Sequence, residues 1–248
     1  MNNASTFLPK IAALAVLAAC AAPVMAQTAG DNIVSAGWFH IVPQDSSSGI
    51  TGSSTIPTAH SSVSNGNTLG LAVTHFFTDN IGVTLDGGIP PEFTLYGKGS
   101  LTSYGEIGNA KQWSPAIVAK YFFGNAQDKF RPFVGAGLSY VTYSDVHLSS
   151  GFQGFASGAT VNPLFAGGTA TASLSSSVAP VISAGMIYNV SDRLSIGLSV
   201  SYLKFHTDAT INATPTAIAQ PYLGSSLTYK TTIDINPIVS FISVGYKF

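Results

Sequence analysis

The chain has 248 residues, of which 46% are hydrophobic and only 8% are charged, and its formal net charge is −1. Soluble globular domains usually carry about 25% charged residues, so this composition argues against an ordinary soluble protein. The balanced charge offers no basic patch for nucleic acid, and we expect no nucleic-acid partner. After the N-terminal segment, no stretch reaches the length of a transmembrane helix without Gly, Pro or polar interruption.

The first 26 residues have the pattern of a secretory signal peptide. Lys10 precedes an apolar run over residues 11–22, and small residues lead up to a cleavage position after Ala26. The run is too short for a membrane anchor, which needs about 20 apolar residues. A lipoprotein signal around Cys20, with lipidation of that cysteine, is the alternative. We therefore expect a cleaved signal peptide over residues 1–26 and a single barrel domain over residues 27–248.

Segments of about ten residues alternate apolar with small or polar side chains. In residues 194–202, Leu, Ile, Leu, Val and Tyr occupy one phase and Ser or Gly the other. A period of two with one apolar face is typical of a strand. The same template predicts eight strands, over residues 32–43, 67–77, 81–89, 112–123, 132–144, 178–189, 193–206 and 231–248.

The connections between these strands alternate in length. The short ones cover residues 78–80, 124–131 and 190–192, and the long ones cover residues 44–66, 90–111, 145–177 and 207–230. This alternation with an even strand count is the pattern of bacterial outer-membrane barrels. The sequence thus predicts an all-β fold: an eight-stranded antiparallel up-and-down transmembrane β-barrel with short periplasmic turns and long extracellular loops, in the outer membrane of a Gram-negative cell.

Aromatic residues fall at the ends of the predicted strands on the lipid-facing phase. Such girdles are expected at both membrane interfaces. The expected girdle residues are Tyr121, Tyr140, Tyr188 and Tyr202. Tyr246 and the terminal Phe248 resemble the C-terminal signal by which the outer-membrane assembly machinery recognises its substrates.

The inward phase of three strands changes character along the barrel. It is small or polar at the periplasmic end and apolar at the outer end, where it carries Val141, Tyr143, Leu203, Phe205, Val239 and Phe241. An eight-stranded barrel has room for packed side chains or one small ligand. These six residues are therefore candidates for the path of a hydrophobic solute, and the alternative is that they pack together as a plug.

Two further features concern the lumen. Asp86 and Lys120 share the inward phase of neighbouring strands and are a candidate charge pair that closes the barrel to ions. Prolines at positions 90, 91, 115, 180 and 237 lie inside or beside predicted strands. Proline lacks the ladder donor, so these positions predict either a gap in the wall or strand ends that fray above the membrane.

Several stretches resemble one known family. Residues 129–140 read KFRPFVGAGLSY and resemble the strand opening R-P-Y-V-G-A-G-L-N-Y of the OmpW family; residues 78–83, 234–237 and 244–248 and the prolines at 90–91 are similar to other parts of it. The resemblance implies a narrow hydrophobic channel that passes small apolar molecules across the lipopolysaccharide layer, with lateral release into the membrane. Asp86-Gly87-Gly88 departs from the family pattern.

Other functional classes have less support. The five histidines are scattered, and neither a Gly-x-Ser-x-Gly nor a His-Glu-x-x-His motif occurs. We therefore expect no enzyme, no catalytic or metal-binding residue and no cofactor, with a lipid-modifying enzyme as the remote alternative. A structural or receptor barrel without transport is the nearer one. The expected partners are membrane lipids, lipopolysaccharide, small hydrophobic solutes and the outer-membrane assembly machinery.

Overall fold

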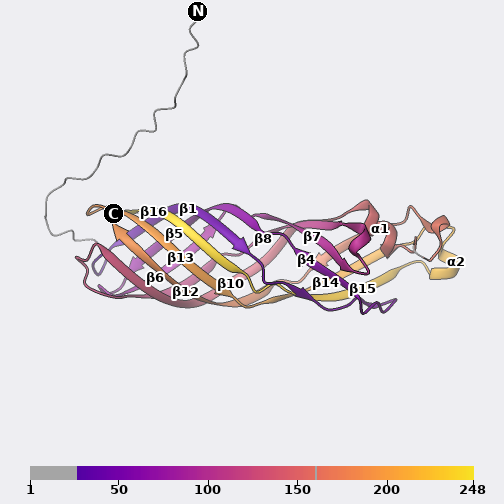
Figure 1. Ribbon diagram of the computed structural model, residues 1–248, viewed down its shortest axis with the longest axis horizontal. Helices are drawn as coiled ribbons and strands as arrows, with labels where there is room; N and C mark the ends of the chain where they lie inside the picture. The colour runs from indigo at the N-terminus through magenta and orange to yellow at the C-terminus, as the bar shows by residue number, and fades with distance from the viewer. Residues whose placement is uncertain (1–26, 160) are drawn as a thin grey trace, which may run out of the picture.

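Eight antiparallel strands close into a barrel in the computed structural model, which describes residues 27–159 and 161–248 (Figure 1). The barrel order is β12-β13-β16-β1-β5-β6-β9-β10, and pairing between β10 and β12 closes the ring. The eight strands are β1 (Asn32–Val42), β5 (Gly66–Phe76), β6 (Ile81–Gly88), β9 (Ala116–Phe122), β10 (Phe130–Leu148), β12 (Ser177–Asn189), β13 (Leu194–Leu203) and β16 (Ile238–Lys247). The predicted fold class is confirmed.

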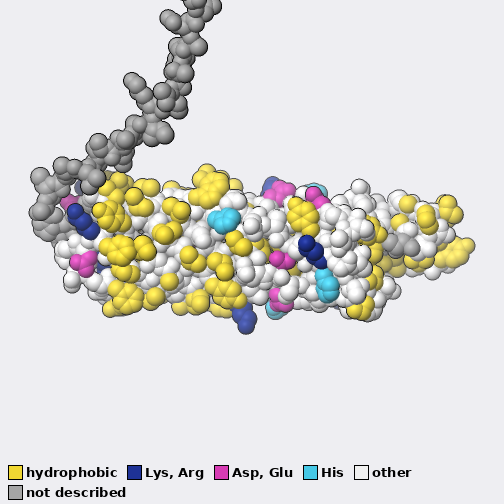
Figure 2. Space-filling view, in the orientation of Figure 1, with side chains coloured by type: hydrophobic (Ala, Val, Ile, Leu, Met, Phe, Trp, Pro, Cys, Tyr) yellow, Lys and Arg dark blue, Asp and Glu magenta, His cyan; other side chains and the backbone are white. Residues whose placement is uncertain are grey.

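The alternation in sequence becomes an alternation of faces. In β13, Leu194, Ile196 and Leu198 are exposed on the outside of the barrel, whereas Ser195 is buried in the lumen. Figure 2 shows hydrophobic side chains gathered over the barrel half of the molecule. Because lipid tails favour an apolar surface and the narrow lumen favours small side chains, this two-residue period suits a barrel in a membrane.

The long connections are not simple loops, because most of them fold into a β-structured extension of the barrel (Figure 1). Strands β8, β7 and β4 continue from the outer part of β10, and β11, β14, β15, β2 and β3 form a second, five-stranded sheet. These strands are β2 (Ser46–Ser47), β3 (Thr51–Gly52), β4 (Ala59–Val63), β7 (Glu92–Gly99), β8 (Glu106–Trp113), β11 (Thr169–Leu174), β14 (His206–Thr214) and β15 (Leu227–Asp234). Short helices complete the extension: α1 (Ser150–Ala156), α2 (Gln220–Leu223) and two 3-10 turns at Thr102–Tyr104 and Pro163–Phe165.

Two predicted strands are interrupted. The segment predicted as 112–123 divides into β8 and β9 at Ser114 and Pro115, and the segment predicted as 231–248 divides into β15 and β16. The second break contains Pro237 and Asn236, whose φ is 40°. Proline cannot donate to a ladder and a positive φ bends the chain, so both segments leave the barrel direction at these points.

Two expectations from the sequence concern the N-terminal segment. The expected signal peptide, residues 1–26, and Cys20 lie outside the described residues. Within residues 27–159 and 161–248, the helices are all too short or too polar to cross a membrane.

Candidate functional site

The six residues expected along the lumen all lie inside the barrel or directly above it. Val141, Leu203 and Phe205 are buried in one apolar cluster, and Tyr143 and Val239 pack against that cluster. Phe241 lies apart from it and stacks on Phe39, with ring centroids 4.0 Å apart. The structure therefore brings five of the six residues together.

Below this cluster a cavity of about 410 Å³ opens in the outer half of the barrel. We call it the lateral cavity, because its lining runs from the lumen into the wall. On the lumen side it is lined by Phe39, Ile41, Val118, Val181, Leu203 and Val239, and on the wall side by residues 87–91 and 112–116.

The wall is open there because the hydrogen-bond ladder between β6 and β9 stops. The last paired residues are Asp86 and Ala116; beyond the gap the Gln112 N–H donates to the Pro91 carbonyl at 3.0 Å, and the ladder resumes between Glu92 of β7 and Lys111 of β8. Gly87 and Gly88 pair with β5 on their other side. Pro90 and Pro91 on one edge and Pro115 on the other lack ladder donors.

Backbone groups at this opening find partners inside the protein. The Ser139 hydroxyl donates to the carbonyls of Ser114 and Pro115 at 3.2 and 3.1 Å, and the Thr68 hydroxyl donates to the carbonyl of Ile89 at 2.6 Å. Unpaired carbonyls are costly in lipid, so an opening in the wall is tolerated only where such groups are satisfied. Because these carbonyls are hydrogen-bonded, the opening is compatible with a barrel wall in lipid.

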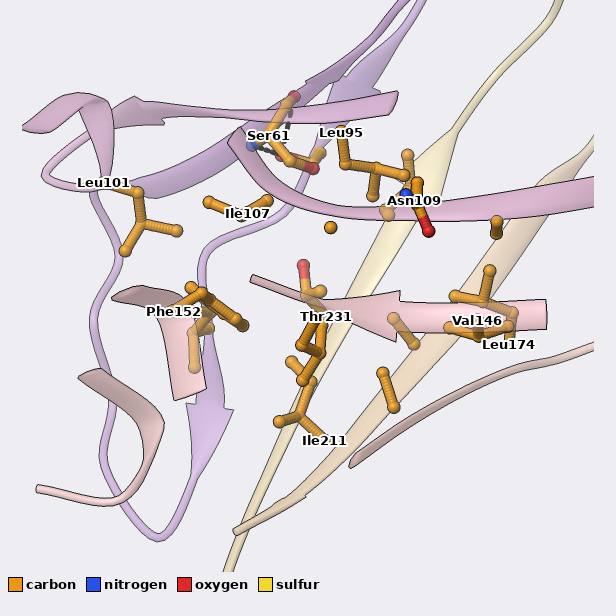
Figure 3. A pocket seen from close by; sticks show the side chains of 18 of the residues that line it. Ser61, Leu95, Leu101, Ile107, Asn109, Val146, Phe152, Leu174, Ile211 and Thr231 are labelled. Carbon is orange, nitrogen blue, oxygen red and sulfur yellow. Dashed lines mark hydrogen bonds between the residues drawn. The ribbon is translucent and has the colours of Figure 1, made fainter. Parts of the chain in front are cut away.

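Two smaller cavities lie above the lateral cavity, in the extension. The outer cavity, about 50 Å³, lies between the two sheets and α1, and its lining is almost wholly apolar (Figure 3). Figure 3 shows Leu95, Ile107, Phe152 and Ile211 among the side chains around it. A third cavity of about 20 Å³, which we call the neck, shares Leu95, Ala110, Leu174 and Ile233 with the outer cavity and Gln112 with the lateral cavity. The three cavities therefore form a series from the extension to the wall opening.

The periplasmic end of the lumen is filled instead. Phe76, Phe122 and Phe133 are buried, with ring centroids 4.8 and 5.2 Å apart along the row. Beside them the fully buried Arg131 donates hydrogen bonds to the Gln27 side-chain oxygen at 3.0 Å and to the Asp79 carbonyl at 2.6 Å. Gln27 in turn donates to Asn189 Oδ1 at 3.0 Å. We call these residues the periplasmic plug.

The two members of the candidate charge pair are close enough to interact electrostatically, but they do not touch. Asp86 lines the lateral cavity opposite Ala116, whereas Lys120 lies four residues further along β9, opposite Gly82. The Lys120 ammonium lies 4.8 Å from the centroid of the Phe133 ring, above the periplasmic plug. Among the described residues, the ion pairs within 4.0 Å are Lys111–Asp145 and Lys247–Asp31, so Asp86 and Lys120 make no direct contact of that kind.

The residues expected to form the girdle and the C-terminal signal lie on the outer surface. They are all exposed: Tyr121, Tyr140, Tyr188, Tyr202, Tyr246 and Phe248. The Tyr246 and Phe248 rings contact each other edge to face at 5.1 Å. Trp38 and Trp113 were not among the expected girdle residues, but they are exposed as well.

Sequence reasoning also missed residues within the cavities. Gln112 and Phe93 are buried there, but Phe93 lies in a segment read as a loop. The alternation of Phe93 and Leu95 with Thr94 and Tyr96 was the available signal of a strand.

A closed eight-stranded antiparallel barrel with an apolar exterior and a β-structured outer extension is an outer-membrane β-barrel protein. Comparison with known sequences specifies the family: a model described as the OmpW family matches residues 28–248, and the chain belongs to this family. Outer membrane protein W of Vibrio cholerae is 35% identical over 241 residues, which cover 96% of this chain and 98% of that protein. The corresponding protein of Escherichia coli K12 is 29% identical over 238 residues, with the same coverage.

Solved structures agree with the fold. The crystal structure of OprG from Pseudomonas aeruginosa superposes with a TM-score of 0.76 at 27% identity, covering 91% of this chain and 99% of that one. The solid-state NMR structure of AlkL in lipid bilayers shares the fold, with a TM-score of 0.58 at 18% identity and coverage of 100% and 97%. The protein is therefore an OmpW-family barrel of the Gram-negative outer membrane.

Proposed function

We propose that this barrel conducts small apolar molecules from the outside into the outer membrane, through the outer cavity, the neck and the lateral cavity, and releases them sideways through the wall. The lateral cavity carries the proposal, because it joins an apolar lumen to an interruption of the wall between residues 87–90 and 113–115. Cavities that bind apolar ligands are concave and mostly apolar, as this one is.

The periplasmic plug supports a sideways rather than an axial exit. A solute that enters the lateral cavity meets the buried rings of Phe76, Phe122 and Phe133 below it and the opening beside it. Leu203 and Val239 line the lateral cavity and Tyr143 lines the neck, whereas Val141 and Phe205 are packed in the adjoining apolar cluster and Phe241 stacks on Phe39. An apolar molecule gains about 25 cal/mol for each Å² of surface removed from water, so such a lining favours its capture.

Filling the lateral cavity tests this proposal. Ser201 lines the cavity, and its neighbour Val200 faces outward on the same strand. We expect Ser201→Trp to place an indole in the cavity and to lower uptake of a labelled alkane to the level of cells without the protein. Val200→Trp adds the same ring on the outer surface and is expected to leave uptake unchanged. Full uptake by a folded Ser201→Trp barrel would contradict the proposal.

Export and assembly form a second part of the proposal. Residues 1–26 act as a cleaved signal peptide, and Tyr246 with Phe248 is read by the assembly machinery. Gln27 supports cleavage after Ala26, because its side chain is already bonded within the periplasmic plug. Mass spectrometry of the protein from outer membranes is expected to find Gln27 as the first residue. A lipidated Cys20 at the N-terminus would contradict it.

A further inference from the structure

Three polar side chains meet in the neck, which is otherwise apolar. They are Gln112 of β8, Tyr143 of β10 and Thr207 of β14, and each comes from a different strand of the extension or its junction with the barrel. Gln112 and Tyr143 are directly opposite one another in the ladder between β8 and β10. The remaining lining consists of Val63, Phe93, Leu95, Ala110, Leu174, Ile233 and Ile235.

The hydrogen-bonding capacity of these side chains is largely unused. The buried Tyr143 hydroxyl lies beside the Thr207 side chain, but it makes no hydrogen bond of good geometry to the described residues. The Gln112 side-chain amide likewise has no hydrogen bond to the part of the chain that the structure describes, although the residue is only 5% exposed. The Thr207 hydroxyl hydrogen is already donated to the Ser175 carbonyl at 2.7 Å. Buried polar groups normally have partners, so free groups in a conduit point to a ligand that supplies them.

The size of the neck restricts what passes it at rest. Its volume of about 20 Å³ is close to that needed for one small oxygen-bearing group. A hydrocarbon chain therefore passes only when the side chains of the neck rotate. An oxygen of the solute that hydrogen-bonds Tyr143 or Gln112 stabilises the solute at this narrow point.

Charge determines which oxygen-bearing group suits the site. Neither the outer cavity nor the neck is lined by Asp, Glu, Lys or Arg in residues 27–159 and 161–248, and the ionisable side chains of the outer cavity are His60 and His147. The lateral cavity beyond is lined by a single ionisable side chain, the acidic Asp86. Transfer of a carboxylate into the neck is costly because no charged side chain lines it.

We infer that the neck is a hydrogen-bonding site. It selects uncharged hydrophobic molecules with one oxygen-containing group, such as medium-chain alcohols and ketones, over alkanes and carboxylates of equal length. The inference rests on the proposed function and adds the substrate class. Tyr143 and Gln112 each donate to or accept from the solute oxygen, and the apolar neck residues surround its chain. They are specificity-determining residues, and the rest of the conduit serves any apolar solute.

The test compares 1-octanol, n-octane and octanoate at neutral pH in cells and in purified barrels. Loss of one hydrogen bond of about 1 kcal/mol corresponds to about a five-fold change, so Tyr143→Phe is expected to lower the octanol-to-octane ratio about five-fold in both uptake and binding. Gln112→Met is expected to act in the same direction. Tyr229→Phe is the matched control, because Tyr229 is a buried tyrosine of β15 outside the neck, and its ratio is expected to remain that of the wild type.

The outcomes separate this inference from the channel proposal. Equal octanol-to-octane binding ratios in folded wild-type, Tyr143→Phe and Gln112→Met barrels would contradict the hydrogen-bonding site in the neck. Octanoate binding as tight as that of 1-octanol would overturn the selection against charge. The wild type could show no uptake above cells without the protein while Tyr143→Phe has a lower octanol-to-octane binding ratio than the wild type. In that case the channel proposal fails and the hydrogen-bonding site in the neck remains supported.

Discussion

The two ends of the barrel lumen are built from different side chains and leave different amounts of space. At the periplasmic end, three phenylalanine rings and the hydrogen-bonded Arg131 fill the interior. In the outer half, Leu203 and Val239 border a cavity of about 410 Å³ that reaches the wall. The wall is continuous around the plug and interrupted around the cavity. The packed periplasmic end and the interrupted outer wall are the two features on which the proposed lateral release rests.

The largest expected effect comes from placing charge in the open half. The double variant Leu203→Asp with Phe241→Asp puts two carboxylates on the apolar lumen surface, where removing them from water is costly. We expect uptake of a labelled alkane to fall to the level of cells without the protein. Unchanged uptake by an assembled double variant would show that the outer lumen is not the route.

Truncation at the two ends compares their packing directly. Phe122 is fully buried among Phe76 and Phe133, whereas Leu203 borders an existing cavity. We expect Phe122→Ala to lower the free energy of unfolding by about 3–5 kcal/mol and Leu203→Ala by about 2 kcal/mol. Denaturant unfolding in lipid measures both values. A larger loss for Leu203→Ala would contradict the contrast between a packed and a hollow end.

The polar part of the plug contributes less. Arg131→Met keeps an apolar stem but leaves the Gln27 side-chain oxygen and the Asp79 carbonyl without their donor. We expect a loss of about 2–3 kcal/mol in the free energy of unfolding, because these hydrogen bonds come from a charged group. Arg193→Met is the control, because the Arg193 guanidinium lies at an exposed turn, where it donates to the Tyr246 hydroxyl. Equal losses for the two variants would show that Arg131 does not hold the plug together.

The smallest expected effect lies in the extension. The Lys111 ammonium donates to Asp145 at 2.9 Å, which lowers the pKa of the Asp145 carboxyl and raises the pKa of Lys111. A lowered carboxyl pKa stabilises the fold above its unfolded value, and that stabilisation is lost as the pH falls through the lowered pKa. The raised pKa of Lys111 acts in the opposite sense, with a loss only as the pH rises through it.

Both side chains are substantially exposed, so solvent screens the pair. We therefore expect Asp145→Asn to leave the thermal midpoint nearly unchanged from about pH 5 to about pH 9, between the ordinary pKa values of the two groups. Thermal unfolding across this range measures it. A clear destabilisation at neutral pH would mean that the extension depends on this ion pair.

The barrel strands were predictable because the pattern of side chains that specifies them is local in the sequence. The alternation of Leu194, Ile196 and Leu198 with serine and glycine specifies a strand and both of its faces, and the placement of Val141 and Leu203 inside follows from parity. The extension was not predictable in the same way. Strand β8 pairs with the outer part of β10, 29 to 40 residues further along the chain, and β7 pairs with β8; no local period reveals these partners.

The candidate site was predictable only in part for the same reason. Proline predicted interruptions at positions 90, 91 and 115, but a single sequence does not tell which interruption adjoins a cavity. The contribution of Gln112 to the neck depends on its register opposite Tyr143. The separation of Asp86 from Lys120 also follows from register, since both residues do lie on the inward phase but at different heights.

The most direct test of lateral release is to close the wall opening reversibly. Cysteines at Ile89 and Ser114 stand on opposite edges of the opening, and a reducible bifunctional thiol reagent joins them. The control pair, Leu198→Cys with Ile242→Cys, stands on paired residues of the continuous wall between β13 and β16. The account predicts that alkane uptake falls when the opening is linked, returns on reduction, and does not change in the control. Full uptake through a barrel with its opening linked would contradict it.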